Sequence, residues 1–225
     1  MRLHLLLPLG ATHRGGDPAA IVDLARRAEA AGADGIVLAE HVVMGVDVST
    51  YPWGRFPLEP SDPFPEPLVL LSAIAAGTTR LQLSTGILIA ALRPAPLLAK
   101  QLATLDRLSA GRLAVGVGTG WHRDELTAHG LDFDARGRLL TDTIAACRAL
   151  WGPQPATVAT ESFSFGPVYC LPAPMTPGGP PVLFSGTLTP RNVDRIVRLG
   201  DGWIPIMGQV ADSIAAGIDQ LRAEL

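Results

Sequence analysis

Hydrophobic and polar positions alternate along the chain in blocks with the length and composition of strands and helices. The block at residues 81–90, LQLSTGILIA, is apolar and β-branched, as is typical of a strand buried on both faces. Residues 94–109 follow with leucines at helical spacing, and Gly111 is a helix stop signal. A second buried strand is expected at residues 113–117, before a glycine-rich loop. The pattern predicts a β-α-β unit whose parallel strands end at one edge of a sheet.

The same alternation extends over the rest of the chain. Further strands are expected at residues 3–9, 35–40, 181–185 and 201–206, and further helices at 18–31, 68–77, 190–199 and 211–225. A short helix and a longer amphipathic one are expected between the glycine-rich loop and residue 151. The proline-rich segments 42–67 and 152–181 are predicted to be irregular insertions. About six βα units are therefore visible, which indicates an α/β fold with a parallel sheet.

More than one architecture is compatible with about six βα units. A closed (β/α)₈ TIM barrel has about 250 residues, so this sequence of 225 residues would stop short of closure. A doubly wound open sheet is the alternative, and it is expected to have a glycine fingerprint after its first strand. Residues 10–16, GATHRGG, do not match that fingerprint. We expect one domain, residues 1–225, built as a TIM barrel shortened at the carboxyl end.

Composition excludes several classes of function. A net charge of −3 and a pI near 5.9 provide no basic surface for nucleic acid. No apolar run reaches the roughly 18 residues of a membrane helix, and the amino terminus becomes polar too soon for a secretory signal. Cys147 and Cys170 lack metal-ligand spacing and suit a reducing cytoplasm. We therefore expect a cytoplasmic protein with no membrane partner and no metal.

Motifs spread over nearly the whole chain resemble one known family. They are the pair Glu40-His41 and segments 66–88, 93–121, 135–151 and 200–206. In this order they resemble the luciferase-like flavin and deazaflavin oxidoreductases, specifically the group that uses coenzyme F420. The resemblance implies a (β/α)₈ barrel with the redox cofactor in the mouth formed by the carboxyl ends of its strands. Most members continue for several dozen residues beyond the end of this sequence.

The predicted catalytic residues are His41 and Glu40, at the end of the strand expected at residues 35–40. An imidazole there can donate to a flavin-type ring or move a proton near neutral pH. Glu40 is expected to orient that imidazole or to contact the ring, although neighbours on an extended segment point to opposite faces. The alternative is that His41 merely ends a strand. The resemblance implies that an acidic residue and a histidine here contact deazaflavin and substrate.

Thr85, Gly86 and Ile87 are predicted to bind the cofactor. A glycine inside a buried strand marks a bulge or the close approach of a ligand, and ordinary strand twist is the alternative. The resemblance implies a non-proline cis peptide bond at Gly86–Ile87, behind the deazaflavin ring. The bond would form the bulge on which the ring rests.

Gly118, Thr119, Gly120 and Trp121 follow the next strand and are also predicted to bind the cofactor. Glycines allow a ligand to approach the backbone, and free amides bind a ring edge or phosphate. A packing turn is the alternative. Some relatives have a catalytic acid at the position of Trp121, so its absence argues against their acid chemistry.

Ser185, Gly186 and Thr187 precede the helix expected at residues 190–199. Small residues at a helix start form an anion site through backbone amides and the helix dipole. We assign this loop to the cofactor phosphate. A simple N-cap by Thr187 or Thr189 is the alternative.

The long segment 42–67 carries Tyr51, Trp53, Phe56 and Phe64. Loops of this length are uncommon unless they are functional or disordered. We interpret the segment as a lid over the substrate, with a surface loop or a dimer contact as alternatives.

The predicted reaction is hydride transfer between coenzyme F420 and a small organic substrate, with His41 as proton donor or orienting group. Because deazaflavin reacts poorly with oxygen, the family expectation is a dehydrogenase or reductase. An FMN-dependent monooxygenase of the same fold is the first alternative. A non-catalytic flavin-binding protein with a reduced barrel is another, as is a fragment that lacks a piece needed for folding. We expect a homodimer that covers the exposed sheet edge.

Overall fold

A parallel sheet of six strands forms the centre of the computed structural model, which describes residues 2–7 and 17–224. The strand order is β1-β2-β3-β4-β7-β8, so each strand lies beside the one that follows it in the βα series. The strands are β1 (His4–Leu6), β2 (Gly35–Leu38), β3 (Gln82–Ile89), β4 (Leu113–Gly118), β7 (Val182–Ser185) and β8 (Gly202–Ile204). The pairing is parallel, as predicted, and the sheet has β1 and β8 as its edge strands, as expected for a shortened α/β barrel.

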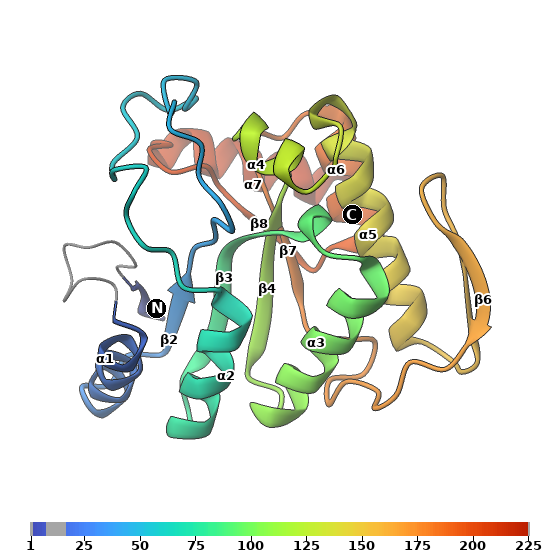
Figure 1. Ribbon diagram of the computed structural model, residues 1–225, viewed down its shortest axis with the longest axis horizontal. Coiled ribbons are helices and arrows are strands. Elements are labelled where there is room, and N and C mark those ends of the chain that lie inside the picture. Colours follow the sequence, from blue (N-terminus) through green and yellow to red (C-terminus); the bar gives the residue numbers. More distant parts are fainter. Residues whose placement is uncertain (1, 8–16, 225) are drawn as a thin grey trace.

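Helices connect the strands and cover one face of the sheet, as Figure 1 shows for α2 and α3. They are α1 (Pro18–Ala30), α2 (Pro67–Gly77), α3 (Ala95–Leu108), α4 (Arg123–Ala128), α5 (Arg136–Trp151), α6 (Pro190–Leu199) and α7 (Ala211–Glu224), with 3₁₀ turns η2 (Ala90–Leu92) and η3 (Phe133–Ala135). Asp17, Glu66 and Thr189 cap α1, α2 and α6 through their side chains, and proline follows each of them. These signals determine where the helices begin.

Alternate residues of each strand face the helices and form the core. Ile36, Leu38, Val115 and Val117 are fully buried against them. The residues between them, such as Val37, point to the opposite, concave face because side chains alternate along a strand. The concave face is therefore lined by small or half-buried residues, and it opens at the carboxyl ends of the strands.

The predicted elements are confirmed, with ends that move by a few residues. The strand expected at residues 3–9 ends at Leu6, and residues 8–9 and the glycine-containing segment 10–16 lie outside the described residues. The strand expected at residues 35–40 ends at Leu38, which leaves Glu40 and His41 on the connection that follows β2. Within the described residues, no helix has the length and apolar character required to cross a membrane.

The prediction that segment 152–181 is irregular throughout is wrong. It contains an antiparallel hairpin, β5 (Ala156–Ala159) and β6 (Ser164–Val168), in which Val158 pairs with Phe165. The burial of β5 alternates, but over only four residues, which is too short a pattern to detect in a proline-rich segment. Pro167 lies within β6, and a two-stranded ribbon tolerates it because each strand has a free edge.

Candidate active site

The carboxyl ends of the parallel strands gather most of the predicted site residues at one edge, the mouth. His41 follows β2, Ile87 lies near the end of β3, Trp121 follows β4 and Gly186 follows β7. Figure 1 shows the long loop after β2 and helix α4 at this same end of the sheet. Hydrogen bonds join His41 and Val42 to Glu125 in α4, and Gly45 to His122, which precedes α4.

His41 is held by a carboxylate that the sequence analysis did not identify. Its Nδ1 lies 2.9 Å from Oε2 of Glu125, and the side chains are 11% and 0% exposed respectively. The other carboxylate oxygen of Glu125 accepts a hydrogen bond of 2.6 Å from the amide of Val42. Among the described residues, Nε2 of His41 has no hydrogen-bonding partner. The imidazole is therefore fixed from one side and leaves its second nitrogen available.

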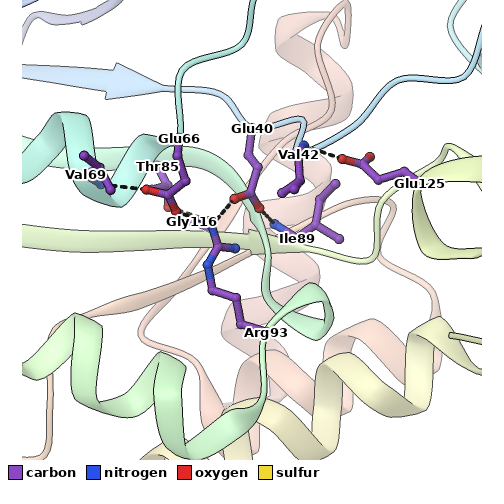
Figure 2. A network of polar contacts seen from close by, with 9 residues as sticks. All are labelled: Glu40, Val42, Glu66, Val69, Thr85, Ile89, Arg93, Gly116 and Glu125. Carbon is purple, nitrogen blue, oxygen red and sulfur yellow. Dashed lines mark hydrogen bonds and ion pairs between the residues drawn. The ribbon is translucent and has the colours of Figure 1, made fainter. Parts of the chain in front are cut away.

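Glu40 does not orient His41, so that part of the prediction is wrong. Its oxygens accept from the amide of Ile89 at 2.6 Å and from the guanidinium of Arg93 at 2.5 Å. Figure 2 shows the Glu40 carboxylate between these two donors. The physical reason is the alternation of an extended segment, which points neighbouring side chains to opposite faces. Glu40 thus ties the end of β2 to the end of β3.

Arg93 bridges two carboxylates, those of Glu40 and Glu66. Burial raises the pKa of Glu40, and the hydrogen bonds and charge of Arg93 and the Ile89 amide oppose this only in part. Burial acts to lower the pKa of Arg93, but the two carboxylates outweigh it and raise that pKa. The negative charge of Glu66 adds to the rise at Glu40, whereas both carboxylates favour the charged form of Arg93. Arg93 thus pairs with two carboxylates, whereas Glu40 has to share the charge of Arg93 with Glu66.

The predicted cis peptide bond at Gly86–Ile87 is confirmed. The pairing of β3 with β4 shifts register between Thr85 and Leu88, so β3 has the predicted bulge. The hydroxyl of Thr85 donates to the carbonyl of Gly116 at 2.8 Å and ties the start of the bulge to β4. Thr85 is fully buried, whereas Gly86 and Ile87 are half-buried at the mouth. Ordinary strand twist does not account for this geometry.

The glycines of β4 and its loop have a packing reason, which was the alternative to ligand binding. A Cβ atom on Gly118 would lie 2.9 Å from Cδ1 of Ile87, and one on Gly120 would lie 3.1 Å from Cγ2 of Ile89. Gly120 also has a positive φ of 75°, which favours glycine. The side chains of β3 therefore occupy the space beside these glycines. Thr119, between them, is half-buried at the mouth.

Trp121 packs against the long loop after β2. Its ring centroid lies 5.0 Å from Tyr51, 5.5 Å from Phe56 and 5.8 Å from His41. Phe64 lies 5.1 Å from His41, edge to face. The loop therefore packs on His41 and Trp121, and its interpretation as a lid stays a prediction.

The loop Ser185-Gly186-Thr187 lies after β7, with β3 and β4 between it and β2. The N-cap alternative holds for Thr189, whose side chain accepts from the amide of Asn192. The Nδ2 group of Asn192 donates to the carbonyl of Thr187 at 3.1 Å. Gly186 has a φ of 121°, which only glycine adopts readily.

Glu125, Arg93 and Glu66 are the site residues that sequence reasoning missed. The available signals were weak: Glu66 precedes Pro67 as an N-cap, and Glu125 lies beside the buried Leu126 in a short helix. The buried His122 accepts a hydrogen bond of 2.7 Å at its Nε2 from the amide of Gly45. No group of potential metal ligands occurs within the described part of the chain.

The comparisons with known proteins identify the family. The family model described as luciferase-like monooxygenase matches residues 1–225, and the chain belongs to this family. An uncharacterised protein of Mycobacterium tuberculosis is 37% identical over 206 residues, covering 90% of this chain and 72% of the relative. An FMNH₂-dependent dimethylsulfone monooxygenase of Pseudomonas fluorescens is 33% identical over 162 residues, covering 71% of this chain and 43% of that enzyme.

Solved structures are similar over nearly the whole chain. The monooxygenase RslO1 of Streptomyces bottropensis matches with a TM-score of 0.79 and 25% identity, covering 98% of this chain and 64% of its own. An F420-dependent secondary alcohol dehydrogenase matches with a TM-score of 0.76 and 20% identity, and the match covers 99% of this chain and 64% of the dehydrogenase. This chain thus spans less than two thirds of both structures. The family includes FMN-dependent and F420-dependent members, so membership establishes a flavin or deazaflavin oxidoreductase family and leaves the cofactor open.

Proposed function

We propose that this protein is an oxidoreductase that transfers a hydride between coenzyme F420 and a small organic substrate. The observation that carries the proposal is His41, which is fixed at the mouth with a free Nε2. It follows β2, the strand that pairs with the bulged strand β3. Similarity in fold to an F420-dependent secondary alcohol dehydrogenase supports the choice of cofactor. The motifs Glu40-His41 and 93–121 support it as well.

Two glycines leave the backbone at the mouth without side chains, Gly86 in the bulge of β3 and Gly186 after β7. A Cβ atom on Gly86 would lie 2.5 Å from Cγ1 of Val37, so only glycine fits at this point of the bulge and no side chain projects from it. A Cβ atom on Gly186 would meet only Nδ2 of Asn192, at 3.5 Å. The loop that contains Gly186 precedes the ten-residue helix α6, whose amino terminus favours negative charge. A ring near Gly86 and a phosphate near Gly186 are therefore compatible with the residues present.

Each proposed role belongs to a residue of this chain. Deazaflavin, when bound, supplies the ring carbon that gives or takes the hydride. Thr85, Gly86 and Ile87 would support the ring through the bulge, while Thr119, half-buried at the mouth, would line its edge. Ser185, Gly186 and Thr187 would hold the phosphate.

His41 would hold or move a proton at Nε2, near the position of the reacting substrate. Trp121 and the aromatic side chains of the long loop would exclude water from the mouth. Glu40 would act by holding the end of β3 through the Ile89 amide. We therefore propose a supporting role for Glu40 in place of direct contact with the reacting atoms.

An FMN-dependent monooxygenase is the second candidate, and a specific observation favours it. The dimethylsulfone monooxygenase that is 33% identical to this chain uses FMNH₂. A bulged strand and a phosphate loop would serve FMN equally well, so geometry alone does not separate the cofactors. We also propose, from sequence, a homodimer in a reducing cytoplasm; gel filtration with light scattering tests the dimer.

Titration with each cofactor tests the proposal. The purified chain is titrated with F420 and, separately, with FMN, in oxidised and reduced forms, and binding is followed by fluorescence. Saturable binding of F420 with at least tenfold preference over FMN is expected. The variant Gly86→Val should weaken the binding, because its Cβ would lie 2.5 Å from Cγ1 of Val37 and the bulge would have to shift. Tight FMN binding with no F420 binding would overturn the choice of cofactor.

A further inference from the structure

The contact between Glu125 and His41 determines more than the position of the imidazole. Glu125 is fully buried, and both of its oxygens are used, one by Nδ1 of His41 at 2.9 Å and the other by the Val42 amide at 2.6 Å. An ionised carboxylate can only accept hydrogen bonds. Nδ1 of His41 must therefore carry a proton whenever this contact is made with ionised Glu125.

The second nitrogen of the ring has the opposite character. A neutral imidazole has one donor and one acceptor nitrogen. With its proton on Nδ1, neutral His41 has an unprotonated Nε2, and that nitrogen has no partner among the described residues. Aromatic rings of Phe56, Phe64 and Trp121 surround the imidazole edge to face and offer no competing acceptor for the ring.

We propose that Glu125 is a positioning residue that selects the tautomer of His41, so that Nε2 is a proton acceptor toward the mouth. This inference rests on the proposed function for its consequence: Nε2 would take a proton from a substrate group that loses a hydride, and return it in the reverse direction. An alcohol is a substrate of this kind: its carbon would give the hydride to the deazaflavin, its hydroxyl would give the proton to Nε2, and a carbonyl group would be left. Glu125 acts through His41 and does not itself touch the reacting atoms.

The same carboxylate joins the orientation of His41 to the position of the loop. Figure 2 shows Glu125 pointing at the amide of Val42, the first residue of that loop. Three residues earlier in the chain than Glu125, His122 accepts from the amide of Gly45. Two residues of segment 122–125 therefore hold the start of the loop: His122 binds the amide of Gly45, and Glu125 binds the amide of Val42. Of these two residues, Glu125 is the one that also contacts the imidazole of His41.

Nuclear magnetic resonance of the histidine rings tests the inference without any cofactor. The whole chain is labelled with ¹⁵N in its five histidines, and His41→Gln assigns the His41 signals. Neutral His41 in the unmodified protein is expected to carry its proton on Nδ1. A neutral ring with its proton on Nε2 would overturn the inference, whatever any variant does.

Substitution then identifies Glu125 as the cause. Glu125→Gln should shift the tautomer ratio of His41 by about tenfold or more, since hydrogen bonds to charged groups exceed neutral ones by that order. Asp124→Asn is the matched control, because it removes the neighbouring exposed carboxylate from the same helix turn, and the ratio should not change. An unchanged ratio in Glu125→Gln would overturn the inference. Should this variant not fold, Glu125→Asp, which shortens the reach but keeps the charge, must shift the ratio in the same direction, and no shift overturns it.

Measuring kcat with F420 distinguishes a failure of this inference from a failure of the proposed function. If F420 binds, Glu125→Gln should lower kcat about 10-fold or more, a part of the roughly 10²–10⁴-fold that a positioned general base contributes, with the Kd for the cofactor unchanged. Unchanged kcat would overturn the catalytic consequence of the tautomer. If F420 does not bind, the proposed function fails, whereas the ring-nitrogen signals still decide whether Glu125 selects the tautomer.

Discussion

Replacing Arg93 with methionine removes the counter-charge of Glu40 and Glu66 while keeping an apolar side chain of similar length. The side chain of Glu40 is 0% exposed and that of Arg93 is 10% exposed, so this is a buried ion pair. Removing one partner of such a pair costs about 3–5 kcal/mol, because an uncompensated charge stays buried. Glu66 is 35% exposed and adds little to this, since water can solvate its carboxylate.

The loss should depend on pH. Burial already raises the pKa of Glu40 above its ordinary 4.5, and removal of Arg93 takes away the main opposition to that rise. A raised carboxyl pKa contributes stability below the unfolded pKa of 4.5, and this contribution is lost as pH rises through the folded pKa. The destabilisation by Arg93→Met should therefore be larger at pH 8 than at pH 5.

Urea unfolding followed by fluorescence of the four tryptophans measures the free energy at both pH values. The matched control is Arg138→Met, which removes an arginine from an ion pair of 2.6 Å whose side chains are 50% and 68% exposed. It should cost about 0–1 kcal/mol. A loss of less than about 1 kcal/mol in Arg93→Met at pH 8, the range of an exposed pair, or an equal loss at both pH values, would refute the reasoning.

Three further changes test other parts of the structure. In Gly45→Ala the new Cβ would lie 2.7 Å from Nε2 of His122, so the loop after β2 should move and limited proteolysis should cut it faster; unchanged cleavage contradicts this. In Gly116→Ala the Cβ would collide with the carbonyl oxygen of Thr85, and denaturant unfolding should show a loss of about 1–3 kcal/mol; wild-type stability would mean that β3 and β4 can separate without cost. Burial acts to raise the pKa of Glu29, but three backbone amides outweigh it and lower that pKa. The stability difference between wild type and Glu29→Gln should therefore be present above pH 4.5 and shrink as pH falls through the folded pKa, and a pH-independent difference would argue against it.

The elements of the fold could be predicted because their signals are local. The β-α-β unit of β3, α3 and β4 has a continuous apolar strand, leucines at helical spacing and a glycine stop, all within about 40 residues. The hairpin of β5 and β6 could not be predicted, because its burial pattern is four residues long and prolines interrupt it. Local patterns identify elements only where they are long enough to repeat.

The candidate site could be predicted in part. The sequence predicted that His41 follows a strand end and that Gly86–Ile87 forms a bulge with a cis peptide bond. The structure has both the bulge and the cis bond at Gly86–Ile87. The partners of these residues were not expected. Glu125 lies 84 residues after His41, and Arg93 lies 53 residues after Glu40. No pattern in the sequence joins residues at such separations.

By itself, the sequence determined the parallel α/β class, the family and the chemical groups at the strand ends. These depend on periodicity, turn chemistry and motifs, which act over a few neighbouring residues. Only the tertiary structure decided that Glu125, and not Glu40, holds His41, and that Glu40 faces Arg93. The reason is geometric: an extended chain turns adjacent side chains to opposite faces, and what each one meets depends on segments brought there by the sheet.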